Sequence, residues 1–401
     1  MRADTDAMTQ GKKHILIIYE SLTTGGSTTS LINLLSELDH SRYEVDLITY
    51  RNENIPKGIR LPEQVNLLNG AAFYGNSPLH RLTKAAILSL SPQFHRAMRA
   101  KRKKQNKYVV LQYMSYARVR ISRPIRKNYR AAIAFVEGWS ASYLLSDKIK
   151  ADKKLVFIHL DYRSAGTDPD IDRKAFGVAN ALITVSESCR LNLIQLYPEY
   201  ADKIFCIENL HSPKRMRRLA DEADIAQTHG RFDFLTVCRP DIYVKGLDRL
   251  LDAATALKEK GYRFRWGILG VNDSPRFREL FSGYGLSGYV IPFESVENPY
   301  PFYKATDRLV VTSRTEAKPM TVTEAQILGV PCIVTEYSSA HEQIRNGIDG
   351  VITENSLKGI TDALQNALEH PEELEKQRMA LKEKSFDFSR ETEKLYSLID
   401  G

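Results

Sequence analysis

The chain has 401 residues, of which 43% are hydrophobic and 26% are charged, as is ordinary for a soluble globular protein. That length exceeds what one hydrophobic core serves, so we expect two domains of roughly 200 residues each. No apolar run approaches the roughly 20 residues of a membrane span, and the initial stretch MRADTDAMTQGKKH contains no signal-like apolar segment. These features argue against a membrane-spanning or exported protein and favour a cytoplasmic one.

Two series of short apolar runs alternate with helical stretches along the chain, and each run has the composition of a buried strand. The first series is HILIIY (14–19), EVDLITY (44–50), AAIAFV (131–136), KLVFIHL (154–160), ALITVS (181–186) and IFCIEN (204–209). The second is FDFLTVCRP (232–240), RWGILG (265–270), GYVIPF (288–293), RLVVTS (308–313), PCIVTE (331–336) and GVITE (350–354). Such strands, separated by helices, predict parallel sheets covered on both faces. We therefore expect an α/β fold with two doubly wound, Rossmann-like domains.

A charged segment at about 212–230 lies between the two series and is the expected joint. The first domain is then predicted to span residues 1–212 and the second residues 213–385. The last stretch contains FSRETEKLYSLID, which is typical of a helix, so we assign a terminal helix to residues 386–401. A basic insertion at about residues 92–130 interrupts the first domain.

The net charge of +8 is distributed unevenly. No Asp or Glu occurs from residue 64 to residue 136, while Arg81, Lys84 and thirteen basic residues between Arg96 and Arg130 lie there. The basic arm that begins at Arg96 and ends at Lys127 interleaves these charges with apolar side chains, as a helix on anionic lipid does. A solvated helical insertion is the alternative. Nucleic-acid binding is disfavoured, because no recognised module accompanies the arm.

Ligands of doubly wound sheets bind beyond the carboxyl ends of the strands, so the residues after each strand are candidates for a site. Gly25 and Gly26 follow the first strand and precede a helix expected from residue 27, where the backbone could approach a phosphate. His159 lies at the end of the fourth run, next to its last residue. Arg239 lies near the end of the seventh run and Lys245 comes six residues later, so two cations could bind one diphosphate. Taken singly, the glycines are often only a tight turn, and a structural histidine and an ordinary surface pair are the preferred interpretations of the others.

The stretch TEAKPMTVTEAQILGVPCIV (315–334) places two carboxylates eight positions apart. Pro319 disfavours a helical residue before it and suits a helix entry, so a helix is expected from near Thr321 to Gly329. Glu316 then lies on the loop before the helix, and Glu324 about one turn inside it. Because the N–H groups at a helix start lack partners, the stretch predicts a cradle for an anion and for hydroxyl groups.

Two features could suggest a metal. The run DPDID (168–172) resembles a DxD metal motif, but it precedes a helical stretch away from the strand ends, so helix capping is the preferred interpretation. The four cysteines are far apart and form no CxxC pair, which favours reduced core residues over disulfides or metal ligands: Cys189, Cys206, Cys238 and Cys332. No metal site is predicted.

In the right order at the strand ends, these motifs resemble the retaining glycosyltransferases of the GT-B fold, and specifically their family 4. The resemblance is strongest in CRPDIYVKGLDRLLDA, RWGILG and TSRTEAKPMTVTEAQILGVPCIVTEYSSAHEQIRNGIDGVI, and looser in GGSTTSLINLL, FIHLD and ITVSESCRLNLIQLYPEY. Glu316 and Glu324 match the family's signature of two glutamates with seven residues between them. Ala317 and Lys318 replace the more common Gly-Phe, which leaves the donor sugar open.

By that resemblance, Arg239 and Lys245 would bind the donor diphosphate and stabilise the departing nucleotide. Glu324 would hold the ribose hydroxyls, Glu316 the hydroxyls of the transferred sugar, and His159 would reach the sugar near the reacting carbon. Charge builds on the departing diphosphate during glycosyl transfer, so preorganised cations lower the barrier. No metal or other cofactor is then required.

The resemblance also implies contacts made by the backbone. Gly26 would let the first domain approach the diphosphate, and amides between Lys318 and Thr321, including that of Met320, would touch sugar and phosphate. The nucleobase would be contacted by the backbone around two residues of the GYVIPF run, Pro292 and Phe293. The terminal helix of this fold returns to the first domain.

The sequence as a whole thus predicts a metal-independent, retaining glycosyltransferase on the inner face of the plasma membrane. It would move a hexose or HexNAc from a nucleotide diphosphate sugar, expected to be UDP-linked, to a bacterial surface glycan or lipid-linked acceptor. The overall resemblance is to capsular and exopolysaccharide enzymes. The alternatives are a GT-B epimerase or phosphorylase, and a nucleic-acid-binding protein on a degenerate transferase scaffold.

Overall fold

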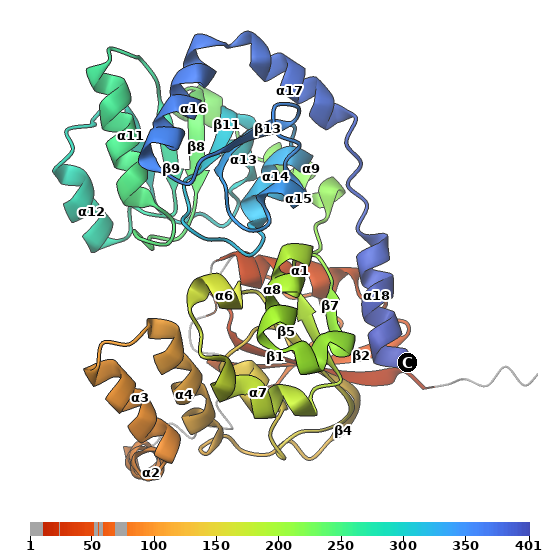
Figure 1. Cartoon of the computed structure of the whole chain (residues 1–401). Coiled ribbons are helices and arrows are strands. Elements are labelled where there is room, and N and C mark those ends of the chain that lie inside the picture. Colours follow the sequence, from red (N-terminus) through yellow and green to blue (C-terminus); the bar gives the residue numbers. More distant parts are fainter. Residues whose placement is uncertain (1–10, 24, 52–54, 56–58, 69–77) are drawn as a thin grey trace, which may run out of the picture.

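The computed structural model of the chain describes residues 11–23, 25–51, 55, 59–68 and 78–401. These residues form two α/β domains, one above the other in Figure 1, each built on a parallel sheet. The predicted fold class is confirmed. Within the described part of the chain, no helix is long and apolar enough to cross a membrane.

The N-terminal sheet has seven parallel strands in the order β3-β2-β1-β4-β5-β6-β7. Its strands are β1 (Lys13–Ser21), β2 (Tyr43–Arg51), β3 (Val65–Leu68), β4 (Asn128–Ala134), β5 (Lys150–Ile158), β6 (Ala181–Thr184) and β7 (Ile204–Cys206). The edge strand β3 has no counterpart in the predicted series, because a four-residue strand with polar Asn66 inside it gives no continuous apolar run. The order changes direction at β1 and β4, where ligand crevices form in such sheets.

The C-terminal sheet has six parallel strands in the order β10-β9-β8-β11-β12-β13. They are β8 (Phe232–Val237), β9 (Trp266–Leu269), β10 (Val290–Phe293), β11 (Thr306–Val311), β12 (Cys332–Thr335) and β13 (Gly350–Thr353). Every predicted strand of the second series is present. Its switch point lies between β8 and β11, so the loops after these two strands frame the C-terminal side of any crevice.

Helices cover both faces of each sheet. In and beside the N-terminal domain they are α1 (Gly26–Glu37), α2 (Pro78–Ser89), α3 (Pro92–Arg102), α4 (Lys107–Val119), α5 (Trp139–Leu144), α6 (Tyr162–Ala165), α7 (Pro169–Val178), α8 (Glu187–Leu196) and the 3-10 turn η2 (Pro198–Lys203). The later helices are α9 (Pro213–Ala220), α10 (Ile225–His229), α11 (Leu247–Glu259), α12 (Pro275–Ser282), α13 (Tyr300–Lys304), α14 (Met320–Ile327), α15 (Ala340–Gln343), α16 (Leu357–Glu369), α17 (Glu372–Lys382) and α18 (Ser389–Asp400).

Successive residues of the central strands are buried on opposite faces, which is what a sheet covered on both sides requires. In β1, Ile15 and Ile17 pack into one core and Leu16 and Ile18 into the other, all with no exposed surface. In the second domain, Leu235 and its neighbour Phe234 on β8 likewise belong to separate cores. This two-sided burial makes the strands rigid supports for the loops that follow them.

The basic segment folds as a group of three helices, α2 to α4, that projects from one side of the N-terminal domain (Figure 1). The interpretation of residues 96–127 as one amphipathic helix on lipid is wrong in its geometry. The chain reverses between α3 and α4, with Lys104 at φ 52°. Helices α3 and α4 pack against each other, and most apolar side chains of the segment are half-buried rather than exposed on one face: Phe94, Met98, Tyr108, Val109, Tyr113 and Met114.

The last helix crosses back from the second domain to the first (Figure 1). Leu395, Tyr396 and Ile399 of α18 are buried in a core of the N-terminal domain. The carboxylate of Asp400 pairs with Lys13 at 2.7 Å and with Arg42. The C-terminal end of the chain therefore fastens the two domains together on the side opposite the projecting helices.

Candidate active site

A cleft of about 450 Å³ lies between the two domains and is lined by residues from both. From the N-terminal domain, the lining comes from Gly25 and the first turn of α1, from the start of α4, and from the loops after β4, β5, β6 and β7. From the C-terminal domain, it comes from the ends of β8, β9 and β11, the loop after β10 and the start of α14. The cleft is thus the place where the carboxyl ends of both parallel sheets face each other, which is where such folds bind ligands.

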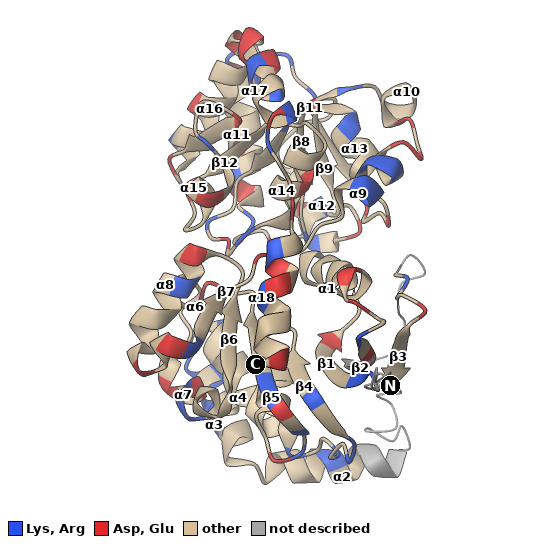
Figure 2. Ribbon diagram, turned by 90° about the vertical axis from the view of Figure 1, so that its right-hand side faces the viewer, with Lys and Arg blue, Asp and Glu red and all other residues tan. Residues whose placement is uncertain are grey.

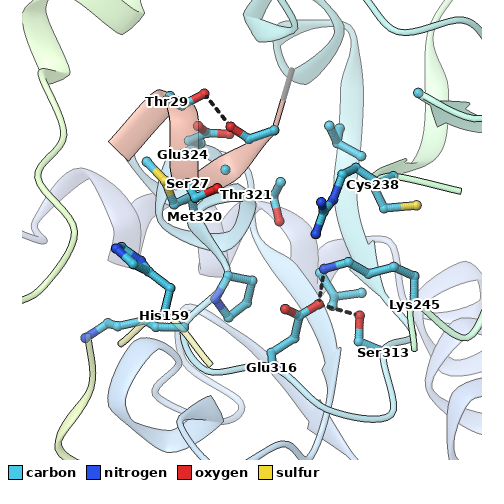
Figure 3. Close-up of a pocket in the computed structure, with 18 of the residues that line it drawn as sticks. Ser27, Thr29, His159, Cys238, Lys245, Ser313, Glu316, Met320, Thr321 and Glu324 are labelled. Carbon is cyan, nitrogen blue, oxygen red and sulfur yellow. Dashed lines mark hydrogen bonds and ion pairs between the residues drawn. The ribbon is translucent and has the colours of Figure 1, made fainter. Parts of the chain in front are cut away.

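Nearly all of the predicted site residues meet at this cleft (Figure 3). Those that line it are Gly25, Gly26, His159, Arg239, Lys245, Glu316, Lys318, Met320, Thr321 and Glu324. They are separated by up to 299 positions in the sequence, since Gly25 and Glu324 both reach it. The roles predicted for them remain predictions, but their proximity is a property of the fold.

Pro292 and Phe293 do not line the cleft. The carbonyl of Phe293 accepts hydrogen bonds from the N–H groups of Gly270, Val271 and Asn272, at 3.0–3.1 Å, so no acceptor remains for a base. Its ring packs against neighbouring aromatic rings instead. The lining of this part of the cleft comes from residues just beyond the strand: Ser295, Val296, Glu297 and Pro299. The strand-end rule would have pointed there if it had been applied after the strand rather than within it.

The turn before α1 brings backbone close to the second domain. Gly25 has φ +154°, a conformation that side chains rarely adopt, and a Cβ there would lie 3.6 Å from Cδ of Arg239. A Cβ on Gly26 would lie 3.9 Å from Sδ of Met320. The positive end of α1 therefore lies at the cleft close to Arg239 and Met320, and the absence of side chains on Gly25 and Gly26 leaves its backbone open to an anion.

Lys245 and Glu316 form an ion pair inside the cleft (Figure 3). Nζ of Lys245 lies 2.6 Å from Oε1 of Glu316, which also accepts a hydrogen bond from Oγ of Ser313 at 2.6 Å. Burial lowers the pKa of Lys245, but the neighbouring Glu316 carboxylate outweighs it and the net shift is upward. Lys245 is therefore a fixed cation whose charge is already balanced before any ligand binds.

Arg239 differs from Lys245 in its surroundings. Its side chain is exposed, and among the described residues it has no ion-pair partner. Together, Arg239 and Lys245 put two cations beside the N-terminus of α1, and only the second is neutralised by a carboxylate. A net positive charge consequently remains in this part of the cleft, where it can attract a diphosphate.

Glu324 is the fifth residue of the eight-residue helix α14 and is buried. Its Oε2 accepts a hydrogen bond from the hydroxyl of Tyr303 at 3.0 Å. Burial raises the pKa of Glu324 to about 7, although the Tyr303 hydroxyl works in the opposite direction. A carboxyl group that titrates near neutrality can accept hydrogen bonds from paired hydroxyl groups once a ligand supplies them.

The start of α14 offers donors to the same space. The amides of Met320 and Thr321 have no acceptor among the described residues, as expected for the first residues of a helix preceded by Pro319. The side chain of Lys318 does not share this orientation. It pairs instead with the carboxylate of Glu208 on the N-terminal domain, so we assign any contact of Lys318 with a ligand to its backbone.

On the opposite wall, His159 is held by its own backbone. The N–H of His159 donates to Oε2 of Glu137 at 2.9 Å, and its ring packs against Phe135 and Phe157. Burial lowers the pKa of His159 to about 4, against a raising hydrogen bond with the Phe135 backbone. The imidazole is therefore neutral near pH 7, and its buried Nε2 has no partner among the described residues.

Several residues of this wall were missed in the sequence, among them Asn209, Glu137 and Tyr108. Glu137 directly follows the third predicted strand, so the strand-end rule could have found it; burial raises its pKa. Tyr108 lies in the first turn of α4, and nothing in the sequence indicated that the projecting helices reach the cleft. Asn106 fixes this turn, because its Oδ1 accepts from the N–H of Tyr108 at 2.9 Å and its Nδ2 donates to the Ala165 carbonyl at 2.8 Å.

The DPDID run performs the capping role that was preferred for it. The side chain of Asp168 accepts a hydrogen bond from the N–H of Asp170 at the start of α7. Asp172 is buried and accepts from the side chains of Gln112, Tyr116 and Tyr162, which ties α4 to the domain. Within the described ranges, no group of three His, Cys, Asp or Glu residues could hold a metal ion.

The comparisons with known proteins agree with this geometry. Residues 220–386 match the family described as Glycosyl transferases group 1. Over 367 residues the chain is 25% identical to EpsF of Bacillus subtilis (strain 168), which is named as a glycosyltransferase; the match covers 87% of this chain and 85% of EpsF.

Two solved structures share the fold over almost their full length. Sucrose-phosphate synthase from Thermosynechococcus elongatus has a TM-score of 0.68 at 16% identity, covering 96% of this chain and 98% of that one. HepE from Anabaena, in complex with UDP-glucose, has a TM-score of 0.66 at 14% identity, with coverage of 96% and 98%. The fold is therefore GT-B, and the family match in the second domain supports a glycosyltransferase.

Proposed function

We propose that this protein is a retaining, metal-independent glycosyltransferase that moves a hexose or HexNAc from a UDP-linked donor to a glycan or lipid-linked acceptor. The observation that carries the proposal is the convergence, in one interdomain cleft, of two helix N-termini, the cations Arg239 and Lys245, and the carboxylates Glu316 and Glu324. These groups match the parts of a nucleotide diphosphate sugar: anionic phosphates, a ribose and a sugar with several hydroxyl groups.

The donor would lie along the C-terminal wall. Glu324 accepts hydrogen bonds from the ribose hydroxyls, and the base occupies the space beside Ser295 and Val296. The diphosphate lies between Arg239, Lys245 and the N-terminus of α1. When phosphate oxygens approach Lys245, its ammonium group is shared with them and Glu316 becomes available to the hydroxyls of the sugar. The HepE complex with UDP-glucose supports a UDP-linked donor.

The chemical step then depends on the charge that develops as the sugar leaves. The bond from the anomeric carbon to the diphosphate oxygen lengthens, the sugar gains oxocarbenium character, and negative charge grows on the departing UDP. Arg239 and Lys245 stabilise that charge without reorganisation, which is why no metal ion is needed in the proposal. Neutral His159 approaches from the N-terminal wall and can accept or donate one hydrogen bond through Nε2.

The acceptor would reach the cleft from the N-terminal domain, and the α2–α4 helices would hold the enzyme at an anionic membrane on the cytoplasmic side. Six exposed cations lie on and just after α3, at the end of the N-terminal domain that is turned away from the C-terminal domain (Figure 2): Arg96, Arg99, Lys101, Arg102, Lys103 and Lys104. Three large apolar side chains on and beside α2 are exposed as well, namely Leu82, Ile87 and Leu90, at 70%, 42% and 75%. Exposed cations beside exposed apolar groups complement anionic lipid, and Tyr108 of the same helical group lines the cleft.

The direct test screens a panel of sugar nucleotides by thermal shift in the presence of EDTA, and then identifies the product formed from the best donor. We expect stabilisation by a UDP-linked sugar, and a glycoside whose anomeric configuration in the NMR spectrum equals that of the donor. An inverted anomer would contradict retention, and a requirement for a divalent ion would contradict metal independence. Release of an epimerised sugar nucleotide or a sugar phosphate would show an epimerase or a phosphorylase. Stabilisation by nucleic acid alone would contradict the transferase.

A further inference from the structure

The loop that carries Glu316 is also where charged side chains join the two domains. Nζ of Lys318 lies 2.7 Å from Oε1 of Glu208, which follows β7 in the N-terminal domain, and 3.9 Å from Oε2 of Glu342 on α15. The Lys318 side chain is only 7% exposed. A buried ammonium group needs a nearby carboxylate, because its desolvation is otherwise unfavourable by several kcal/mol. Lys318 of the C-terminal domain thus depends on a carboxylate of the N-terminal domain.

Glu342 makes a second connection across the same interface. Its carboxylate accepts hydrogen bonds from the N–H groups of Glu187 at 3.0 Å and Ser188 at 2.7 Å. These are the first two residues of α8, whose amides have no partner within the helix and lie at its positive end. A carboxylate from the C-terminal domain therefore caps a helix of the N-terminal domain.

Apolar packing fixes the residue between Glu316 and Lys318. Ala317 forms a small buried cluster with Val185 and Cys189 of the N-terminal domain. Sγ of Cys189 donates to the Ala317 carbonyl at 3.7 Å. Residues 317 and 318 are consequently both held by the opposite domain, while the neighbouring Glu316 side chain points into the cleft toward Lys245 (Figure 3).

The N-terminal side of this contact is itself well anchored. The N–H of Glu208 donates to Oε2 of Glu391 on α18 at 2.9 Å, and Lys394 pairs with the same Glu391 carboxylate. Burial, and secondarily the Lys318 cation, lowers the pKa of nearby His211 to about 3, so this histidine is neutral near pH 7. The charge of Lys318 is therefore balanced by Glu208 and Glu342 and is not opposed by a protonated His211.

We propose that Lys318 is a positioning residue: its ion pair with Glu208 holds the two domains together and directs Glu316 at the donor sugar in that closed arrangement. The inference rests on the proposed function, because it takes the role of Glu316 from it. When the domains separate, Lys318 loses Glu208 and Ala317 loses its packing against the N-terminal domain. Glu316 then keeps only its contacts within the C-terminal domain, with Lys245, Ser313 and Ser338, while the two residues that follow it are no longer held. Donor-sugar contact and domain closure are thereby one event.

The test compares the full-length wild type with Lys318→Met, Glu208→Gln, the double variant and Lys318→Arg. Methionine keeps the length and packing of the stem but removes the charge, and arginine keeps the charge. Lys358→Met is the matched control, since the pair of Lys358 with Asp362 lies within α16. Small-angle X-ray scattering without ligand reports domain closure. Release of UDP from UDP-glucose, followed as kcat and KM, reports the position of Glu316.

We expect Lys318→Met and Glu208→Gln to enlarge the radius of gyration and to lower kcat about tenfold, with KM changed by less than about twofold. The double variant should lose no more than either single variant, because each one already breaks the same pair. Lys318→Arg should restore both scattering and kcat toward the wild type. Glu208→Gln carries the test alone if Lys318→Met does not fold, since Glu208 is 40% exposed.

If the single variants give the same scattering curves as the wild type, the Lys318–Glu208 pair does not hold the domains together. Additive losses of kcat in the double variant would contradict that role as well. A failure of Lys318→Arg to restore kcat would overturn the positioning role. A wild type that neither binds UDP nor releases it from UDP-glucose would instead contradict the proposed function. The ligand-free scattering comparison would still decide whether Lys318 and Glu208 close the domains.

Discussion

The two walls of the cleft are built in different ways. Apart from Glu297, the C-terminal wall takes its charged residues from two compact stretches, 238–245 and 313–324, each close after a central strand. The N-terminal wall collects single residues from widely spaced loops and from a projecting helix: Tyr108, Glu137, His159 and Asn209. The charged residues of the C-terminal wall can therefore be recognised as contiguous sequence motifs, whereas most residues of the N-terminal wall come together only when the chain folds.

The two walls also differ in whether they lie within the part of the chain that matches the glycosyltransferase family. The family match covers residues 220–386, which include the whole charged part of the C-terminal wall. The α2–α4 helices, which add Tyr108 to the opposite wall, lie outside it. We infer that the C-terminal wall serves the donor common to many such enzymes and that the N-terminal wall adapts the protein to its own acceptor and surroundings.

The largest expected effect belongs to the N-terminal side. Neutralising Lys101, Arg102, Lys103 and Lys104 should weaken binding to anionic vesicles by about 4 kcal/mol, at roughly 1 kcal/mol for each basic residue at the surface. Stabilisation by UDP should be unchanged, because these residues are remote from the C-terminal wall. Co-sedimentation with vesicles of phosphatidylserine and phosphatidylcholine measures the loss.

The matched control neutralises four exposed lysines of the second domain: Lys260, Lys358, Lys376 and Lys382. If vesicle binding falls equally in the control, the loss reflects the lower net charge of the protein and not a specific contact of the α2–α4 helices. A wild type that does not bind anionic vesicles would leave the helices as a solvated insertion.

On the donor wall, Arg239→Ala and Lys245→Ala should each lower kcat/KM by about 3 kcal/mol, roughly 100-fold, because both cations act on charge that grows in the transition state. Affinity for the intact donor should fall less. Arg239→Lys should restore little, since an ammonium group cannot reproduce the bidentate guanidinium. Steady-state kinetics with the best donor from the panel measures the effect. Variants that melt normally and turn over within a few-fold of the wild type would refute a role in diphosphate binding.

Glu324→Gln should change the pH dependence of stability. The Glu324 pKa is raised from 4.5 to about 7 in the folded chain, so the folded state holds more protons between these values and loses stability as pH rises through them. Glutamine removes that loss, and the variant should gain about 2.5 kcal/mol relative to the wild type between about pH 5 and pH 8. Urea unfolding at pH 5 and at pH 8 measures the free energy of unfolding of the wild type and the variant. If the difference between the two proteins is the same at both pH values, Glu324 does not titrate in this range.

The smallest expected effect separates the two glutamates of the C-terminal wall. Glu316→Ala should depress turnover but leave the affinity for free UDP within about twofold, because Glu316 faces the sugar. Glu324→Ala should mainly weaken UDP binding, because Glu324 faces the ribose. Titration calorimetry with UDP compares them. Equal losses of UDP affinity in the two variants would contradict this assignment.

The contrast between the walls also explains what the sequence could predict. The strand series and the pair Glu316 and Glu324 follow from local patterns, since apolar runs and helix-start signals are properties of neighbouring residues. The partner of Lys318 is not local: Glu208 lies 110 positions earlier, and only the docking of the domains brings it within 2.7 Å. Tyr108 reached the cleft for the same reason, because the turn at Lys104 redirects α4.

Two other differences have equally physical causes. The apolar residues of the basic arm predicted a lipid-facing helix, but alternation of charge and apolar side chains serves a packed pair of helices just as well. The base contact predicted around Pro292 and Phe293 stays a prediction, but the Phe293 carbonyl is already used by the turn that follows β9, and the sequence carries no signal of such backbone bonds. Residues that line the C-terminal wall through their side chains were therefore easier to predict from the sequence than contacts made by the backbone.

Hydrogen–deuterium exchange of the full chain with and without UDP, in the presence of EDTA, tests the central claim most directly. Slower exchange is expected in two parts of the C-terminal wall, residues 238–246 and 314–325, and at the turn and first residues of α1 in the N-terminal domain, residues 25–30. The backbone amides of α3, the helix with the exposed cations, should exchange at the same rate with and without UDP. Protection confined to α2–α4, or no protection anywhere in the presence of UDP, would contradict a nucleotide-sugar site between the two domains.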